Sequence, residues 1–401
     1  MKITLIAGAR PNFMKVAPII KAIKKHNSEV INGDALLNGG LSYRLVHTGQ
    51  HYDKNMSDTF FEELGIPAPD VNLGCGGGSQ AEQTAAIMVA FEKELMAHPA
   101  DIVLVVGDVT STMACSIVAK KLNTKVCHVE AGIRSWDLTM PEEINRMVTD
   151  SLADYMFTTS DVANRNLLRM GATLMNEGVK ELRSKDVTQR VWFVGNVMID
   201  TLLANRSRFR KPEIWDELRL QEKQFVVMTM HRPANVDEEN HLRAMMEQII
   251  DNVHGLPVIF PIHPRTAKLL LGERTAKGLK DASLQDASKM LQERWPNLHI
   301  VEPMGYLEFN YLVERAKAVV TDSGGITEET TVMGVPCITL RDNTERPETC
   351  TVGTNELIGT NPSAIKPALD KLFAGEWKKG AIPELWDGHT AERIIEILAK
   401  L

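Results

Sequence analysis

Acidic residues stand at three points where a folded chain could gather reactive groups. Asp108 follows the apolar run 101–107, Glu130 follows the run 124–129, and Glu142 follows Pro141 at the start of a helical stretch. Clustered carboxylates titrate as a coupled set and serve as general acids and bases. Asp108 could instead cap a helix, and Glu142 could serve only the helix dipole. No helix begins directly after Glu130, so Glu130 points most directly to proton chemistry.

A second group of residues is suited to holding a phosphate. Ser323, Gly324 and Gly325 follow the apolar run 317–322 and precede a helical stretch. Glycines let a ligand approach the backbone, and the N–H groups of a helix N-terminus attract an anion. Carboxylates within 327–329 would repel that anion, so a ribose diol is their natural partner. The cations that could neutralise a diphosphate are Arg10, Lys15 and Arg346.

Short apolar runs alternate with amphipathic helical stretches, which indicates an α/β fold with parallel sheets. In the first half the runs are 3–7, 43–47, 101–107, 124–129, 155–160 and 191–195; in the second they are 225–230, 256–262, 298–303, 317–322 and 335–340. Ligands bind beyond the carboxyl ends of parallel strands. His231 and His263 also follow such runs, so these histidines, more often structural when taken singly, join the candidates.

Two doubly wound domains and one large barrel both fit this alternation. A chain of 401 residues favours two domains, with a boundary after Gly195. The polar stretch 27–42 is expected to be a surface loop, because it is rich in Gly and Asn and has no periodicity.

Composition excludes several classes of function. A net charge of −7 argues against a general nucleic-acid binder. No apolar run approaches the roughly 18 residues of a membrane span, and we expect a cytoplasmic protein. The five cysteines show no CxxC pair, and no cluster has the spacing of metal ligands. We therefore expect free thiols, no metal and no membrane partner.

The motifs of this chain, taken together and in order, resemble one enzyme family. They include GARPNFMKVAP, HTGQHYDKNM, VVGDVTST, HVEAGIRS, MPEEINR, MHRPANVD, IHPRT, TDSGGITEE and LRDNTERPE. The set is similar to that of the non-hydrolysing UDP-N-acetylglucosamine 2-epimerases and their relatives, the UDP-2,3-diacetamido-glucuronate 2-epimerases. The resemblance implies two Rossmann-like doubly wound domains facing across a cleft, the glycosyltransferase B-type architecture. It implies domains at 1–197 and 198–382, with 383–401 packing back on the first, and a homodimer.

The resemblance also implies a role for each matched residue. Asp108, Glu130, Glu142 and His231 would line the catalytic cleft. The residues that would hold the UDP-sugar are Arg10, Lys15, Met304, Phe309, Ser323, Gly324, Gly325, Glu329 and Arg346. Independently of the resemblance, Arg134 and Arg146 are expected from their positions beside Glu130 and Glu142 to orient or counterbalance the carboxylates, and His263 is a further supporting candidate. No cofactor is implied.

The chemistry of inverting C2 fits these residue types. The C2 proton of a 2-acetamido sugar is not next to a carbonyl, so its direct removal is prohibitive. Oxidation by a nicotinamide would need a glycine fingerprint that the first strand–helix turn lacks. Elimination of UDP acidifies C2–H and gives a 2-acetamidoglucal, to which UDP adds back after protonation on the opposite face. That route needs carboxylates on both ring faces and cations at the departing diphosphate.

Several alternatives stay open at this point. The substrate could be a UDP-diacetamido-uronate sugar instead of UDP-GlcNAc, and a hydrolysing relative would release free sugar and UDP. A glycosyltransferase would use the same phosphate turn but needs an acceptor groove. A catalytically dead sensor would keep the UDP contacts and lose a carboxylate.

Overall fold

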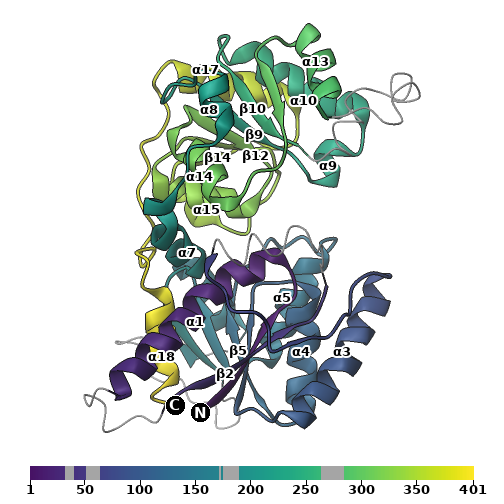
Figure 1. The fold of residues 1–401 in the computed structure, drawn as a ribbon, viewed down its shortest axis with the longest axis vertical. Coiled ribbons are helices and arrows are strands. Elements are labelled where there is room, and N and C mark those ends of the chain that lie inside the picture. Colours follow the sequence, from purple (N-terminus) through teal and green to yellow (C-terminus); the bar gives the residue numbers. More distant parts are fainter. Residues whose placement is uncertain (32–39, 51–63, 171–172, 175–188, 263–283) are drawn as a thin grey trace. The chain divides into compact units, whose positions relative to one another are not determined.

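The computed structural model describes residues 1–31, 40–50, 64–170, 173–174, 189–262 and 284–401 (Figure 1). Within these ranges the chain forms two compact units, each built on one parallel sheet. Unit 1 comprises Met1–Asn205 and Glu384–Leu401, and unit 2 comprises Arg206–Pro383. The predicted α/β fold class is confirmed, and the alternative of one barrel is wrong, because the strands form two separate sheets.

The sheet of unit 1 has the strand order β3-β2-β1-β4-β5-β6-β8-β7. Its strands are β1 (Lys2–Ala7), β2 (Ser42–His47), β3 (Val71–Asn72), β4 (Ile102–Val106), β5 (Lys125–Val129), β6 (Tyr155–Thr158), β7 (Thr173–Leu174) and β8 (Arg190–Phe193). The chain runs outward from β1 to β2 and β3, then returns to place β4 on the other side of β1. This reversal makes the carboxyl ends of β1 and β4 the topological switch point, where such sheets bind ligands.

Helices cover both faces of this sheet (Figure 1). They are α1 (Arg10–Ile31), α3 (Gln80–Ala97), α4 (Thr110–Lys121), α5 (Pro141–Leu152), α6 (Asp161–Arg169), α7 (Val197–Asn205) and α18 (Thr390–Leu398). The loop expected from residue 27 begins later, because α1 continues to Ile31. The Asn27 side chain accepts from the Leu41 N–H at 2.9 Å and donates to the Leu41 carbonyl at 2.7 Å. Residues 32–39 lie outside the described part of the chain.

The sheet of unit 2 has the order β11-β10-β9-β12-β13-β14. Its strands are β9 (Val226–Thr229), β10 (Val258–Pro261), β11 (Leu298–Val301), β12 (Ala318–Thr321), β13 (Cys337–Thr339) and β14 (Asn355–Leu357). Its helices are α8 (Glu213–Glu217), α9 (Pro233–Val236), α10 (Glu239–Asn252), α13 (Leu284–Arg294), α14 (Tyr306–Arg315), α15 (Gly324–Met333), α16 (Pro347–Thr351) and α17 (Ile365–Phe373), with short 3-10 turns at Arg206–Arg208 and Pro362–Ala364. The switch point falls between β9 and β12.

The apolar runs became strands because they are buried on both faces. All five residues of β4 are buried, as are all four of β12. Every predicted run carries a strand, whereas the short strands β3, β7 and β14 were not predicted. None of the described helices combines the length and the apolar composition that crossing a bilayer requires.

The C-terminal segment is part of unit 1. The Trp386 indole donates to the Thr159 carbonyl at 2.9 Å, and the Asp200 carboxylate on α7 accepts from the first N–H groups of α18, Thr390 at 3.1 Å and Ala391 at 2.6 Å. Gly195 has φ +100°, and a Cβ there would lie 2.1 Å from the Leu385 carbonyl oxygen, so only glycine fits. Asp200 thus caps α18 from another helix. Burial raises its pKa, although these two N–H groups oppose the rise.

Replacing Asp200 should loosen the C-terminal helix. In Asp200→Ala the buried N–H groups of Thr390 and Ala391 lose their acceptor, which should cost about 1–3 kcal/mol. Amide hydrogen exchange of α18 should then accelerate by roughly tenfold or more. Asp161→Ala is the control, because its ion pair with Arg165 is exposed and should contribute only about 0.5 kcal/mol. Unchanged protection of α18 in Asp200→Ala would contradict the capping role.

Candidate active site

Two predicted carboxylates follow the carboxyl ends of neighbouring strands in the sheet of unit 1. Val106 of β4 pairs in register with Val129 of β5, so Asp108 and Glu130 follow neighbouring strand ends. Glu130 is 3% exposed and has φ +71°, a left-handed conformation that is costly for a residue with a side chain. Its backbone N–H donates to the Phe157 carbonyl at 3.0 Å. The turn thus holds Glu130 in a fixed and strained place.

Each carboxylate has a cationic partner from a helix. Lys15 on α1 contacts Glu130 Oε2 through Nζ at 2.7 Å, and Arg146 on α5 donates to Asp108 Oδ2 through Nε at 3.0 Å. Gly107, between the two strand ends, has φ +67°, and a Cβ there would lie 3.0 Å from Lys15 Nζ. The side chain of Asp108 remains 30% exposed while that of Arg146 is 5% exposed. The structure thus brings Asp108, Glu130, Lys15 and Arg146 together.

The two acidic residues at the start of α5, Glu142 and Glu143, have different surroundings. Glu143, the next residue in the first turn of α5, is fully buried. Its carboxylate accepts from Ser135 N–H at 2.9 Å and from Arg146 Nη1 at 2.8 Å, so it fixes the loop before α5 and orients Arg146. Glu142 is exposed and makes no hydrogen bond or ion pair with the residues that the structure describes. Its catalytic role remains a prediction.

Arg134 pairs with a carboxylate that sequence reasoning did not single out. Arg134 Nη1 lies 2.7 Å from Asp150 Oδ2, and His128 Nδ1 lies 2.7 Å from Asp150 Oδ1. All three side chains are almost completely buried. Asp150 lies within an amphipathic helix, where a charged residue would ordinarily face solvent. The buried cluster behind the sheet edge was therefore missed.

The predicted phosphate turn begins the helix α15 of unit 2. Ser323 occupies the N-cap, but its side chain makes no capping hydrogen bond, so the first N–H groups of α15 remain for another acceptor. A Cβ at Gly325 would meet nothing within 4 Å in the described structure. Neither local strain nor crowding requires glycine at this position, whereas close approach of a ligand to the backbone would.

His231 and Asp322 form a hydrogen-bonded pair at the switch point between β9 and β12, in the sheet of unit 2. His231 Nδ1 lies 2.8 Å from Asp322 Oδ1; the histidine side chain is 63% exposed and Asp322 is fully buried. Asp322 also accepts from the Arg232 N–H at 2.9 Å and from Asn235 Nδ2 at 3.1 Å. Burial would raise the pKa of Asp322, but the hydrogen bond and charge of His231, with these donors, hold it below its usual range. The pairing leaves His231 Nε2 as the outer ring nitrogen.

Two neighbouring carboxylates on α15 have distinct partners. Glu329 accepts a hydrogen bond from the Tyr306 hydroxyl at 2.9 Å, while Glu328 is ion-paired with Arg346. Burial raises the pKa of Glu329 to about 7, against the opposing hydrogen bond from Tyr306, and raises the pKa of Tyr306 well above its usual range. Arg346, predicted to contact the diphosphate, is thus held by a buried carboxylate.

The remaining predicted residues can be placed in part. Met304 and Phe309 are half-buried and pack on the apolar layer beside α14. Arg10 begins α1, but its side chain lies outside the described structure, as does the whole of His263. The predicted residues that the structure describes therefore fall into two sets, one in each unit.

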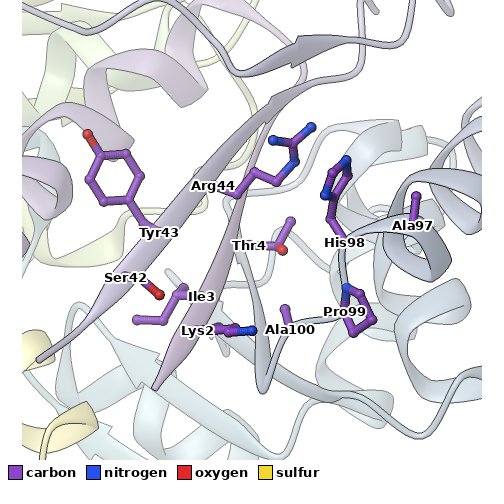
Figure 2. A pocket seen from close by; sticks show the side chains of 10 residues that line it. All are labelled: Lys2, Ile3, Thr4, Ser42, Tyr43, Arg44, Ala97, His98, Pro99 and Ala100. Atoms are coloured by element: carbon purple, nitrogen blue, oxygen red, sulfur yellow. The ribbon is translucent and has the colours of Figure 1, made fainter. Parts of the chain in front are cut away.

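A cavity elsewhere in unit 1 does not coincide with either set. It has a volume of about 300 Å³ and lies at the amino-terminal edge of β1 and β2 (Figure 2). Lys2, Thr4, Arg44 and His98 are among its lining residues, and Arg44 is ion-paired with Glu94 at 2.6 Å. None of the predicted site residues that the structure describes lines it. Among the described residues no group of three or more His, Cys, Asp or Glu could hold a metal ion.

Comparison with known proteins identifies the family. Paired units on doubly wound parallel sheets, with polar residues at both switch points, place the chain among two-unit α/β enzymes. A family model described as UDP-N-acetylglucosamine 2-epimerase matches residues 36–399. The chain belongs to the UDP-N-acetylglucosamine 2-epimerase family.

Individual relatives agree with this assignment. The UDP-N-acetylglucosamine 2-epimerase of Methanocaldococcus jannaschii is 38% identical, over 99% of both chains. The crystal structure of the M. jannaschii UDP-GlcNAc 2-epimerase in complex with UDP-GlcNAc and UDP matches with a TM-score of 0.78 and 36% identity, covering 100% of both chains. The UDP-2,3-diacetamido-2,3-dideoxy-D-glucuronate 2-epimerase of Pseudomonas aeruginosa is 35% identical, over 100% of both chains.

The raised pKa of Glu329 predicts a pH-dependent stability. Its ordinary value is 4.5 and its folded value about 7, so the folded state binds more protons between these values. The contribution of Glu329 to stability is therefore largest below pH 4.5 and is lost as the pH rises through 7. In Glu329→Gln, Tyr306 can still donate to the amide oxygen while the ionisation is removed.

Urea unfolding at pH 5 and pH 8 measures this effect. Between the two values the variant should gain roughly 2–3 kcal/mol relative to the wild type, since one pKa unit corresponds to about 1.4 kcal/mol. Glu302→Gln, which removes an exposed carboxylate of unit 2, should leave the pH dependence unchanged. If Glu329→Gln and the wild type lose stability in parallel, the carboxyl group is not the source of the pH dependence.

Proposed function

We propose that this protein interconverts UDP-GlcNAc and UDP-ManNAc by eliminating UDP and adding it back. Family membership and the relatives named above support the reaction. The observation that carries the proposal for this chain is the pair of carboxylates, Asp108 and Glu130, at the ends of neighbouring strands. A UDP-sugar is the substrate class, because the related M. jannaschii structure is in complex with UDP-GlcNAc and UDP.

Asp108 and Glu130 are proposed to handle the C2 proton. When the bond between C1 and the diphosphate oxygen breaks, its electron pair leaves with UDP and C1 becomes electron-deficient. One carboxylate then takes the C2 proton, and the C2–H electron pair forms the double bond of 2-acetamidoglucal. Return of a proton to the opposite face of C2, with attack of UDP on C1, gives the other epimer. The two ring faces require two separately held groups, which adjacent strands supply.

The unit-2 residues are proposed to stabilise the departing UDP. The first N–H groups of α15 and the guanidinium of Arg346 favour the negative charge that develops on the diphosphate. His231 is oriented by Asp322, and its outer nitrogen is available to donate a hydrogen bond or a proton to the same group. Glu329 is proposed to accept from the ribose, with Met304 and Phe309 beside the uracil. Closure of the two units around the substrate is part of this proposal.

A modified sugar is the second candidate substrate. The P. aeruginosa relative, named for a UDP-diacetamido-glucuronate, is 35% identical, against 38% for the M. jannaschii enzyme. These values are too close to separate the substrates, so both sugars belong in the same assay. The homodimer and the cytoplasmic location expected from the sequence remain proposals here.

Incubation with UDP-GlcNAc in D2O, without nicotinamide or acceptor, tests the function directly. We expect UDP-ManNAc to form, with deuterium at C2 of both sugars, because the proton exchanges with solvent while UDP is detached. Nuclear magnetic resonance of the C2 position measures both outcomes. A parallel reaction with the UDP-diacetamido-glucuronate sugar compares the substrates. Formation of free sugar and UDP, or no exchange with either substrate, would contradict the proposed epimerase.

Neutral replacements of the two carboxylates should separate catalysis from binding. Asp108→Asn and Glu130→Gln should each lower kcat by about 10²–10⁴-fold, the usual contribution of a general acid or base. Calorimetric binding of UDP should change little, because UDP is placed mainly by unit 2. Asp161→Asn, whose side chain is 71% exposed, is the matched control and should keep normal activity. Near-normal epimerisation by both site variants would remove them from the mechanism.

A further inference from the structure

The cluster of His128, Asp150 and Arg134 has no assigned role. His128 is fully buried, Asp150 is 1% exposed and Arg134 is 5% exposed. Such a cluster is costly, because the desolvation of buried charges often exceeds their mutual attraction, and apolar residues of similar size would stabilise the fold as well or better. Its presence directly behind the two carboxylates therefore requires a reason other than stability.

Two hydrogen-bond partners fix the orientation of the His128 ring. Nε2 lies 2.8 Å from the Gly107 carbonyl oxygen, and Nδ1 lies 2.7 Å from Asp150 Oδ1. A carbonyl oxygen accepts hydrogen bonds and cannot donate them, and the same is true of an ionised carboxylate. Burial would raise the pKa of Asp150, but the charges and hydrogen bonds of His128 and Arg134 outweigh it and keep the pKa low. The Gly107 carbonyl therefore receives its hydrogen bond from His128 Nε2, and His128 Nδ1 faces the Asp150 carboxylate.

This arrangement fixes both strand ends that carry the proposed acid and base. Through His128, Asp150 holds the carbonyl of Gly107, the residue before Asp108. Directly, Asp150 Oδ2 accepts from the N–H of Gly132, two residues after Glu130, at 3.0 Å. Gly107, Glu130 and Gly132 have φ values of +67°, +71° and +78°. The two glycines adopt this conformation freely, whereas Glu130, which has a side chain, needs surrounding contacts to hold it there.

We propose that Asp150 is a positioning residue that, through His128 and Gly132, sets the separation and orientation of Asp108 and Glu130. The proposal rests on the proposed function, because it assigns Asp150 to the same proton transfer. Two further sets of paired charges lie beside these turns, Lys15 with Glu130 and Arg146 with Asp108 and Glu143. Asp150 thus reaches both turns, one through His128 and the other through the Gly132 N–H.

A matched pair of variants tests this role. Asp154 performs the comparable task at the opposite end of β5, where its carboxylate accepts from the Val126 N–H at 2.8 Å and pairs with Lys120 at 2.8 Å. Asp150→Asn should lower kcat for C2 exchange by about 100-fold, as expected from a misplacement near 1 Å. KM should change by less than about threefold, because the substrate contacts are retained. Asp154→Asn should lose stability but keep kcat within about twofold of the wild type.

Two kinetic outcomes would overturn the proposal: an unchanged kcat in Asp150→Asn, or equal losses of kcat in Asp150→Asn and Asp154→Asn. If Asp150→Asn does not fold, His128→Gln tests the same link, since its amide can serve only one of the two acceptors. The nitrogen-15 spectrum of His128 gives a readout that does not depend on activity. Nε2 should carry a proton in the wild type, because it is the donor to the Gly107 carbonyl, and an unprotonated Nε2 would overturn the proposal. Absence of exchange by the wild type would instead overturn the proposed function.

Discussion

The Asp150 carboxylate connects the turns that follow β4 and β5 in unit 1, and the arrangement of both turns depends on its hydrogen bonds. It joins three donors from separate points of the chain, His128 on β5, Gly132 in the following turn and Arg134 beyond it. Asp322 has a comparable role in unit 2. It follows β12 and accepts hydrogen bonds from the Arg232 N–H and Asn235 Nδ2, and it pairs with His231. In each unit a buried carboxylate, on α5 in unit 1 and after β12 in unit 2, thus accepts hydrogen bonds from the turns at the carboxyl ends of the strands.

A carboxylate suits this task for a physical reason. Hydrogen bonds to a charged acceptor contribute about 1.5–3 kcal/mol each, roughly twice the value of neutral ones. That gain can offset the strain of a left-handed residue such as Glu130, which is of order 1–3 kcal/mol. Apolar packing is not directional and would leave the turns after β4 and β5 free to shift. The order at this edge therefore comes from charge-assisted hydrogen bonds, while the order of the sheet interior comes from burial of β4 and β12.

The difference explains what the sequence could predict. Buried strands read as apolar runs, so the two sheets, and Asp108 and Glu130 at their strand ends, could be found from periodicity alone. Helix α5 could not be read in this way, because it buries Glu143, Arg146 and Asp150 and exposes Ile144 (48%) and Met147 (38%). A prediction that places the hydrophobic face of α5 against the core would therefore give the helix the wrong orientation. The partners of Asp150 are separated from it by 16 to 22 residues, and nothing in their spacing marks the contact.

The inverted helix also shows which constraint prevailed in α5. Burying an Ile or Met side chain stabilises a fold by about 1.5–3 kcal/mol, so a helix with Ile144 and Met147 inside would add stability. Such a helix would carry Arg146 away from Asp108, and Asp150 away from His128 and Gly132. The two strand ends would then lose the donors and acceptors that define their turns. The orientation of α5 therefore satisfies the polar contacts with the turns after β4 and β5, at the expense of apolar burial.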